Sequence, residues 1–372
     1  MNPFSYGTIV RGDNFYDRKE EKERIISTLL GGNNLVLFAP RRYGKTSLVF
    51  KAIEELERQG IDCIYFDMMP VYSLESFVIL FLQAIEKKQT KIEQFVKTIS
   101  TCLKNIRPKL VFDNSGKPEF SIDFVEDKVS IRTVAELLDL PEKLTRKGQR
   151  TIVIFDEFQE ITKFDKYGFE NLLRSKIQQQ QNVNYLFLGS KTHILTDMFT
   201  NKKKPFYNSA LNMQISTLPE RETINFLQRK FSENKIEIEE KECVYLIEKT
   251  TNIPYYIQLL SSEVWQYTIT TKEKVSKEII DICIKRIVEL KYDYYYELFD
   301  KHSVMQKKLL KALTISGENI FSAEYLKTNR LSASSTVQKS VSILMDSGLV
   351  DKSSNKYFIS DPFFQLYIQN YA

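Results

Sequence analysis

Histidine and cysteine are scarce in this chain, which has 2 histidines and 4 cysteines among its 372 residues. The histidines, His193 and His302, stand far apart, and the cysteines lack the close spacing of metal ligands. We therefore expect no metal site built on imidazole or thiolate groups. The thiols should be reduced and mostly buried, as in a cytoplasmic protein. They are Cys63, Cys102, Cys243 and Cys283.

Long apolar runs are also missing. The longest, such as Phe77–Leu82, are much shorter than the roughly 20 residues that a membrane-spanning helix requires. The first residues lack the basic start and apolar centre of a signal peptide. With 42% hydrophobic and 27% charged residues, the composition is that of a soluble protein of two or three domains, with no membrane partner. The net charge of +5 permits contact with nucleic acid but does not require it.

A strand, a tight loop and a helix follow one another between residues 33 and 53. Leu35–Phe38 is an uncharged apolar run, typical of a strand that is buried on both faces of a sheet. After Gly44–Ser47 the apolar residues recur at the spacing of a helix. This order predicts a phosphate-binding loop, in which backbone N–H groups and the helix N-terminus face the phosphates of a nucleotide.

The loop residues predict roles for individual side chains. Lys45 would reach the β and γ phosphates of ATP, and the Thr46 hydroxyl would bind Mg²⁺. Ala39 replaces the first glycine of the usual pattern, which is acceptable if φ is negative there, whereas Gly44 is retained where the backbone approaches phosphate. The expected nucleotide-binding residues are Pro40, Arg41, Arg42, Tyr43, Gly44, Lys45, Thr46 and Ser47.

A second uncharged strand at Ile152–Phe155 ends in two adjacent acids. Because ligands bind at the carboxyl ends of parallel strands, Asp156 would hold Mg²⁺, either directly or through water. Glu157 would be the base that polarises the attacking water. Adjacent acids often do no more than begin a solvated helix, but their position after a buried strand favours a catalytic role. Gln159 and Glu160 are expected on the polar face of the following helix.

A third apolar strand, Asn184–Ser190, ends in a small polar residue. In a parallel sheet Ser190 would emerge beside the other strand ends, where it can contact the γ-phosphate or the water. A Gly-Ser turn that only terminates the strand explains the same residues. The predicted catalytic residues are Glu157, Lys45 and Ser190.

Taken in order, these motifs resemble the AAA+ superfamily. More narrowly, they resemble a bacterial and archaeal P-loop ATPase family of the STAND-like group, distantly similar to archaeal origin-recognition ATPases. The matching segments, which cover nearly the whole chain, are FYDRKEEKERI, APRRYGKTSLV, IFDEFQEI, LLRSKIQQQQNVNYLFLGSKTHIL, PFYNSALNMQI, TNIPYYIQLL and YFISDPFFQLYI. The resemblance implies ATP and Mg²⁺ as ligands, Ser190 as the sensor-1 residue, and Phe15–Glu21 near the adenine. Asp17 and Glu20 alternatively form a helix capping box.

Two arginines of the resembling proteins have no match here, one in PFYNSALNMQI and one in TNIPYYIQLL. An arginine finger contributes about 10³ to 10⁵ in rate. The isolated protein should therefore hydrolyse ATP slowly, unless Arg42, Arg174 or a neighbouring subunit supplies the charge.

The predicted fold class is α/β, with a P-loop AAA+ core around a parallel sheet, then a helical lid and a C-terminal winged helix. The expected domains are residues 1–218, 219–299 and 300–372. The core contains an insertion at about 72–148, with a basic helix at 87–107 and a hairpin turning at 114–116. The insertion is either a partner-binding element or an embellishment that packs on the sheet.

The last two regions leave further alternatives open. The aromatic segment Tyr292–Phe299 either stacks on bases or packs in a core. If the winged helix binds DNA, Ser332–Lys339 would enter the major groove, with Lys352 and Lys356 near phosphates. Winged helices also dock proteins.

The sequence as a whole favours an ATPase that binds and hydrolyses Mg-ATP as a conformational switch acting on a protein partner. One alternative is an origin-recognition-like ATPase that binds duplex DNA through its winged helix. Another is a scaffold that binds nucleotide without turnover. An oligomer is compatible with each of these functions.

Overall fold

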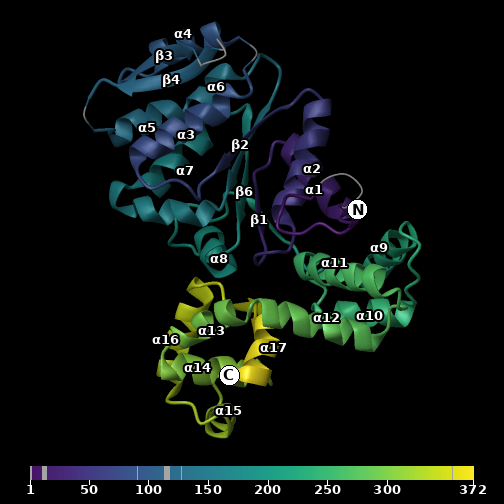
Figure 1. The fold of residues 1–372 in the computed structure, drawn as a ribbon. Helices are drawn as coiled ribbons and strands as arrows, with labels where there is room; N and C mark the ends of the chain where they lie inside the picture. The colour runs from purple at the N-terminus through teal and green to yellow at the C-terminus, as the bar shows by residue number, and fades with distance from the viewer. Residues whose placement is uncertain (1, 11–14, 90, 113–117, 127, 354) are drawn as a thin grey trace. The chain divides into compact units, whose positions relative to one another are not determined.

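The computed structural model describes residues 2–10, 15–89, 91–112, 118–126, 128–353 and 355–372. The chain divides into two compact units (Figure 1). The sheet unit consists of Lys19–Ala39 and Leu48–Ile215, and the helical unit consists of Met1–Arg18, Pro40–Ser47 and Ser216–Ala372. Within the described residues, no helix is both long enough and apolar enough to cross a bilayer.

The sheet unit is built on a five-stranded parallel sheet with the strand order β2-β5-β6-β1-β7. The parallel P-loop core that the sequence predicts is thus confirmed. Since all five strands run the same way, their carboxyl ends share one edge of the sheet. The strands are β1 (Leu35–Phe38), β2 (Asp62–Asp67), β5 (Thr151–Asp156), β6 (Val183–Gly189) and β7 (Leu211–Gln214).

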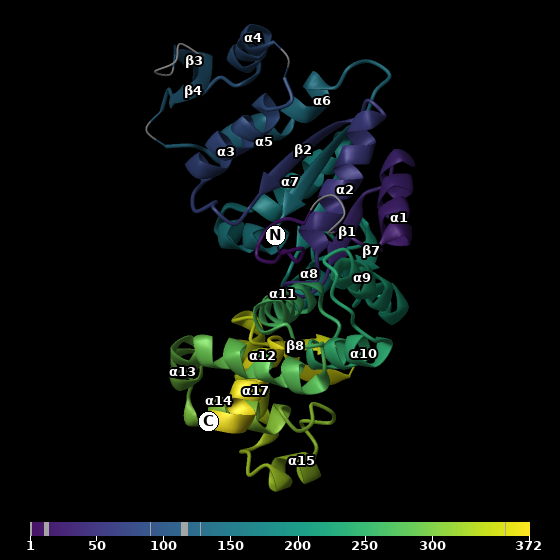
Figure 2. The same ribbon diagram turned by 45° about the vertical axis from the view of Figure 1, so that its right-hand side comes forward.

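Helices cover both faces of this sheet, which explains why its central strands carry no charge before their carboxyl ends. Figures 1 and 2 show α1 and α2 on one side and α3, α5 and α7 on the other. Alternate strand residues, such as Val153 and Phe155, join the core under the second group of helices. The helices are α1 (Lys19–Leu30), α2 (Lys45–Arg58), α3 (Leu74–Glu86), α5 (Ile131–Leu138), α6 (Leu140–Leu144), η2 (Phe158–Tyr167, a 3₁₀ helix), α7 (Phe169–Gln179) and α8 (Thr192–Thr200).

The insertion contributes α4 (Ile92–Cys102) and a hairpin of β3 (Ile106–Phe112) and β4 (Pro118–Phe124). The helix predicted over 87–107 is wrong in its extent, because the chain is already a strand at Ile106. The predicted turn at 114–116 lies outside the described residues. Buried apolar residues of α4, including Phe95 and Ile99, belong to the same core as the sheet residues. The insertion therefore packs as part of this unit, as one of the two alternatives expects.

The first part of the helical unit contains α9 (Glu220–Ser232), α10 (Glu240–Lys249), α11 (Pro254–Thr271), α12 (Lys277–Leu290) and α13 (Tyr292–Asp300). Helices α12 and α13 are separate, because the backbone leaves helical geometry at Lys291 (φ −105°, ψ 10°). Tyr295 on α13 is fully buried and packs against Phe364 and Tyr367. Packing, rather than base stacking, therefore occupies this tyrosine.

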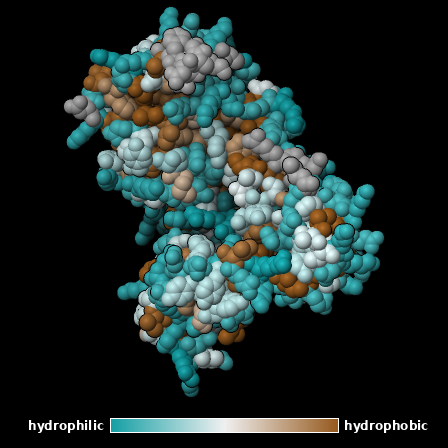
Figure 3. All heavy atoms as spheres, in the orientation of Figure 1, coloured by the Kyte–Doolittle hydropathy of each residue, from teal (hydrophilic) through white to brown (hydrophobic). Residues whose placement is uncertain are grey.

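The last part of the helical unit contains α14 (Val304–Leu313), α15 (Ala323–Thr328), α16 (Ser334–Asp346), the antiparallel pair β8 (Val350–Ser353) and β9 (Lys356–Ile359), and α17 (Pro362–Tyr371). Three helices and a hairpin form the predicted winged helix. The sequence reading missed α17, although Asp361 caps it through the backbone N–H groups of Phe363 and Phe364. In Figure 3, the visible face of these elements is mainly hydrophilic, with small scattered apolar patches.

Candidate functional site

The phosphate loop, Pro40–Ser47, leaves the end of β1 and runs into α2, which begins at Lys45. Among the described loop residues, φ is positive at Arg42 (72°) and Gly44 (81°) but not at Ala39. Alanine is therefore acceptable at the first position, as expected. At Gly44 the positive φ favours glycine, and a Cβ atom there would meet no other atom within 4 Å. The backbone at this point borders open space of the kind that a phosphate group needs.

Lys45 and Ser47 of the loop form hydrogen bonds within the helical unit. The Lys45 ammonium is buried and donates a hydrogen bond of 3.0 Å to the carbonyl of Pro40, across its own loop. The Ser47 hydroxyl accepts a bond of 3.0 Å from the backbone N–H of Val10. The first residues of the chain thus support the loop from outside the motif.

Arg18 is a supporting residue that the sequence reading missed. Its side chain is 2% exposed and donates to the carbonyls of Tyr43 (3.2 Å) and Ser216 (2.7 Å). Both Asp17 (φ 59°) and Arg18 (φ 62°) are left-handed, unlike the extended residue of a capping box. The segment expected near the nucleotide therefore holds the loop backbone through its arginine. In the sequence, the only indication of this role was a basic residue within the segment Phe15–Glu21, which precedes the first strand.

Arg42 joins the loop to the winged helix within the helical unit. Its Nη1 atom lies 2.9 Å from the Oδ2 atom of Asp361 and donates to the Tyr256 hydroxyl. The guanidinium also lies over the rings of Tyr255 (4.7 Å) and Tyr256 (5.0 Å). Burial raises the pKa of the Tyr256 hydroxyl, and the nearby Asp361 carboxylate raises it further. The Tyr256 hydroxyl remains protonated and donates to the carbonyl of Ser360 (3.2 Å).

The predicted acids lie at the carboxyl edge of the sheet, in the sheet unit. Asp156 ends β5 and is 5% exposed. Its Oδ1 atom accepts from the backbone N–H of Glu157 (2.8 Å), and its Oδ2 atom accepts from the hydroxyl of Tyr65 on β2 (2.5 Å). Burial raises the pKa of Tyr65, and so does the adjacent Asp156 carboxylate, so the phenol remains a donor. Tyr65 is a second residue that the sequence reading missed.

Glu157 is held by two neighbours. Its Oε2 atom accepts from the Ser190 hydroxyl (2.7 Å) and from the Gln159 carboxamide (2.5 Å). Glu157 itself is left-handed (φ 49°), a conformation that is costly for a residue with a side chain and is often found at functional sites. The structure therefore brings Ser190, directly after β6, into contact with the predicted base.

The expectation that Gln159 and Glu160 form a polar helix face is wrong. Gln159 is 2% exposed and Glu160 is 9% exposed. The chain turns into the 3₁₀ helix η2 directly after Glu157, which directs Gln159 back toward the end of β6. A Cβ atom on Gly189 would come within 2.2 Å of the Gln159 carboxamide oxygen, so glycine at the end of β6 leaves the space for that carboxamide.

The side chains of the phosphate loop and the acid at the end of β5 are of the types that bind Mg-ATP. The open backbone at Gly44 and the buried Lys45 ammonium suit phosphate. The Thr46 hydroxyl and the Asp156 carboxylate supply oxygen donors, which Mg²⁺ prefers. Across the described ranges, no three or more His, Cys, Asp or Glu side chains gather as a metal cluster. This donor set suits Mg²⁺, because Mg²⁺ in nucleotide sites takes few protein ligands and keeps several waters.

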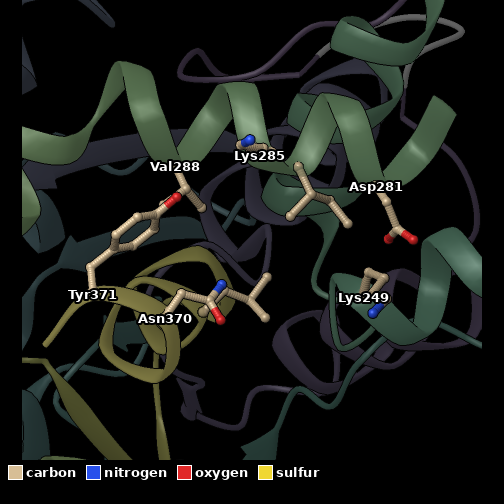
Figure 4. A pocket seen from close by; sticks show the side chains of 8 residues that line it. Lys249, Asp281, Lys285, Val288, Asn370 and Tyr371 are labelled. Atoms are coloured by element: carbon tan, nitrogen blue, oxygen red, sulfur yellow. The ribbon is translucent and has the colours of Figure 1, made fainter. Parts of the chain in front are cut away.

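A separate hollow of about 490 Å³ lies in the helical unit between α10, α12 and α17 (Figure 4). Lys249 and Lys285 face it together with Asp281, and the Tyr371 ring lies along one end beside Val288. The hollow contains none of the residues predicted to bind nucleotide or metal. Its mixed charge gives no indication of a particular ligand.

Comparisons with known proteins give a consistent result. A model of an ATPase domain found predominantly in Archaea matches residues 15–260, and a model of a winged helix domain matches residues 293–370. An uncharacterized ATP-binding protein of Pyrococcus horikoshii is 24% identical over 251 residues, which are 65% of this chain and 73% of that protein. The solved Walker-type ATPase of Pyrococcus abyssi is 18% identical with a TM-score of 0.66, over 99% of both chains. The Aeropyrum pernix ORC2 protein is 13% identical with a TM-score of 0.48, over 99% of this chain and 97% of its own.

Proposed function

This chain belongs to the family of ATPase domains found predominantly in Archaea, and we propose that it binds and hydrolyses Mg-ATP as a conformational switch acting on a protein partner. The family match and the winged helix support an ATP-binding P-loop protein of the AAA+ type. The role of a switch, the hydrolysis and the partner are our proposal.

The residues that we propose for nucleotide binding come from the phosphate loop and from the carboxyl ends of the strands. The loop leaves the end of β1, and β1 shares its carboxyl edge with β5 and β6. Lys45 and the backbone N–H groups of residues 41–47 hold the phosphates, while Thr46 and Asp156 hold the metal. When bound, Mg²⁺ neutralises charge that develops on the β and γ phosphates.

Glu157 is the proposed base. It orients a water and takes its proton, while the water oxygen bonds to the terminal phosphorus and the bond to the ADP oxygen breaks. Ser190 and Gln159 fix the carboxylate that does this. Arg42 forms an ion pair with Asp361 and a hydrogen bond to Tyr256, so its charge is not directed at the phosphates. Slow hydrolysis is therefore expected unless Arg174 or a partner supplies a cation.

The contact between Arg42 and Asp361 is the observation that carries the proposal of a switch. One residue belongs to the phosphate loop and the other caps the last helix of the winged helix. Phosphate charge on the loop competes with the Asp361 carboxylate for the same guanidinium. Because coupling between two sites is reciprocal, a partner whose affinity for the winged helix changes with bound nucleotide changes nucleotide affinity by the same factor.

Hydrogen exchange with and without Mg-ATP tests the switch directly. We expect slower exchange in the peptide over 40–47 and a changed rate in the peptide over 361–371, with both effects absent in Lys45→Ala. If the loop responds and the winged-helix peptide does not, the protein binds nucleotide without switching. If neither responds and ATP does not bind, the nucleotide site itself is wrong.

Duplex DNA is a second candidate partner, favoured by the surface of α16. This helix exposes Ser335, Thr336, Gln338 and Lys339, and the wing exposes Lys352 and Lys356. Steady-state ATP hydrolysis with and without duplex DNA decides the question, with Glu157→Gln as the blank. A large, salt-sensitive stimulation that Lys339→Glu abolishes would establish the DNA partner. Turnover that is indifferent to DNA favours a protein partner, and absence of turnover in every condition favours a scaffold.

A further inference from the structure

We propose that Tyr65 is a positioning residue for Asp156, which fixes this carboxylate so that it can hold the Mg²⁺ of the bound nucleotide. The inference rests on the proposed function and deepens it. It concerns a residue on β2, outside the phosphate loop and outside the acidic strand.

The pairing of β2 with β5 brings the two side chains together. Tyr65 lies opposite Ile154, and Asp67 lies opposite Asp156. Side chains that are two residues apart point to the same face of a sheet, so Tyr65 and Asp156 are diagonal neighbours on one face. A tyrosine is long enough to cross that diagonal, and its hydroxyl lies 2.5 Å from the Oδ2 atom of Asp156.

The two oxygens of the Asp156 carboxylate are held from different directions. The backbone N–H of Glu157 holds Oδ1, and the Tyr65 hydroxyl holds Oδ2. Two bonds at opposite oxygens fix the plane of the carboxylate. A carboxylate has about four acceptor positions, so it can accept several hydrogen bonds at once.

The tyrosine is itself fixed in place. Its ring packs on Phe50 of α2, with ring centroids 4.8 Å apart, and the ring is half-buried. A donor held by packing keeps its aim, which is how residues behind a metal ligand orient it. A phenol also donates without cancelling the negative charge, whereas a lysine or arginine here would compete with the metal for the carboxylate.

Tyr65→Phe removes one hydroxyl and keeps the packing on Phe50. The measurement is the affinity for a fluorescent ADP analogue by anisotropy, with Mg²⁺ and again with EDTA. We expect the gain in affinity that Mg²⁺ provides to fall by about 10- to 100-fold, with the affinity in EDTA unchanged. Tyr185→Phe is the matched control, because it removes another buried hydroxyl from the same sheet, one that donates to Gln180. It should leave both affinities unchanged.

A double variant separates positioning from a purely structural effect. In an Asp156→Asn background the carboxylate that Tyr65 positions is absent, so Tyr65→Phe should lower the remaining gain from Mg²⁺ no further. An unchanged Mg²⁺ gain in Tyr65→Phe would overturn the inference, and so would equal losses with Mg²⁺ and with EDTA, or losses that add in the double variant. If the unaltered protein binds no nucleotide, the proposed function itself is wrong. If it binds nucleotide and Tyr65→Phe leaves the Mg²⁺ gain unchanged, only this inference is wrong.

Discussion

The Nη1 atom of Arg42 lies 2.9 Å from the Oδ2 atom of Asp361, although 319 residues separate them in the sequence. The same carboxylate accepts from the Tyr295 hydroxyl (3.3 Å) and caps α17 with its other oxygen. One side chain thus serves the phosphate loop, the packing of α13 and the start of the last helix. The phosphate loop and the winged helix thus share an electrostatic contact.

Asp361→Asn should tighten ATP binding. Asparagine keeps the helix cap but removes the charge that neutralises Arg42, so the loop becomes more positive toward phosphate. We expect a gain of about 5-fold or more in affinity, the lower end of typical coupling energies, and a smaller gain at high salt. Titration of a fluorescent ATP analogue measures it. Glu324→Gln, an exposed acid on α15, is the control that should change nothing. Unchanged affinity in Asp361→Asn would mean that the ion pair does not couple the two elements.

Gln159→Leu should slow hydrolysis while leaving ATP affinity unchanged. Leucine keeps the volume of the buried side chain and removes the bond of 2.5 Å to Glu157, so the base loses its orientation. We expect kcat to fall by about 10-fold or more. A loss of ATP affinity of the same size would indicate a general structural defect.

Gly189→Ala tests the same contact from the other side. The added methyl would come within 2.2 Å of the Gln159 carboxamide and 2.4 Å of Leu195. It should lower kcat as Gln159→Leu does, and the double variant should be no slower than the single ones, because both act on one contact. Additive losses would show that Gly189 acts through Leu195 instead. Single-turnover kinetics on all three proteins provides the comparison.

Arg18→Met should destabilise the helical unit and weaken ATP binding. The change leaves the carbonyls of Tyr43 and Ser216 without their charged donor, and hydrogen bonds to charged groups contribute about 1.5 to 3 kcal/mol each. We expect the free energy of unfolding in urea to fall by about 2 kcal/mol or more. Arg24→Met, at an exposed site on α1, is the matched control. Equal stability of the two variants would show that Arg18 does not stabilise the loop.

Three of the four cysteines should resist alkylation in the folded protein. Burial raises the pKa of Cys63, Cys243 and Cys283 to about 12, so almost none of these thiols is ionised at neutral or mildly alkaline pH. Cys102 is half-buried and should react first. Mass spectrometry after brief treatment with N-ethylmaleimide at about pH 8 should therefore find a single modification, and all four after unfolding. Early modification of Cys243 would show that α10 opens readily.

Much of the fold follows from local patterns in the sequence. Uncharged runs such as Leu35–Phe38 and Ile152–Phe155 predict strands buried between helices, and the structure has them within β1 and β5. The helices from Glu220 to Leu313 follow from spacing in the same way. The break at Lys291 and the helix α17 did not follow, because short or interrupted amphipathic segments carry little periodicity.

The candidate site likewise has parts that the sequence predicts and parts that only the structure shows. The sequence by itself determined the phosphate loop, the acid pair and Ser190, because each is a chemical group placed next to the end of a recognisable strand. Only the tertiary structure decided what holds those groups. Tyr65, Gln159, Arg18 and Asp361 reach them from other strands, turns and helices, and such contacts depend on strand order and packing. A spacing rule reads neighbours along the chain, whereas hydrogen bonds form between neighbours in space.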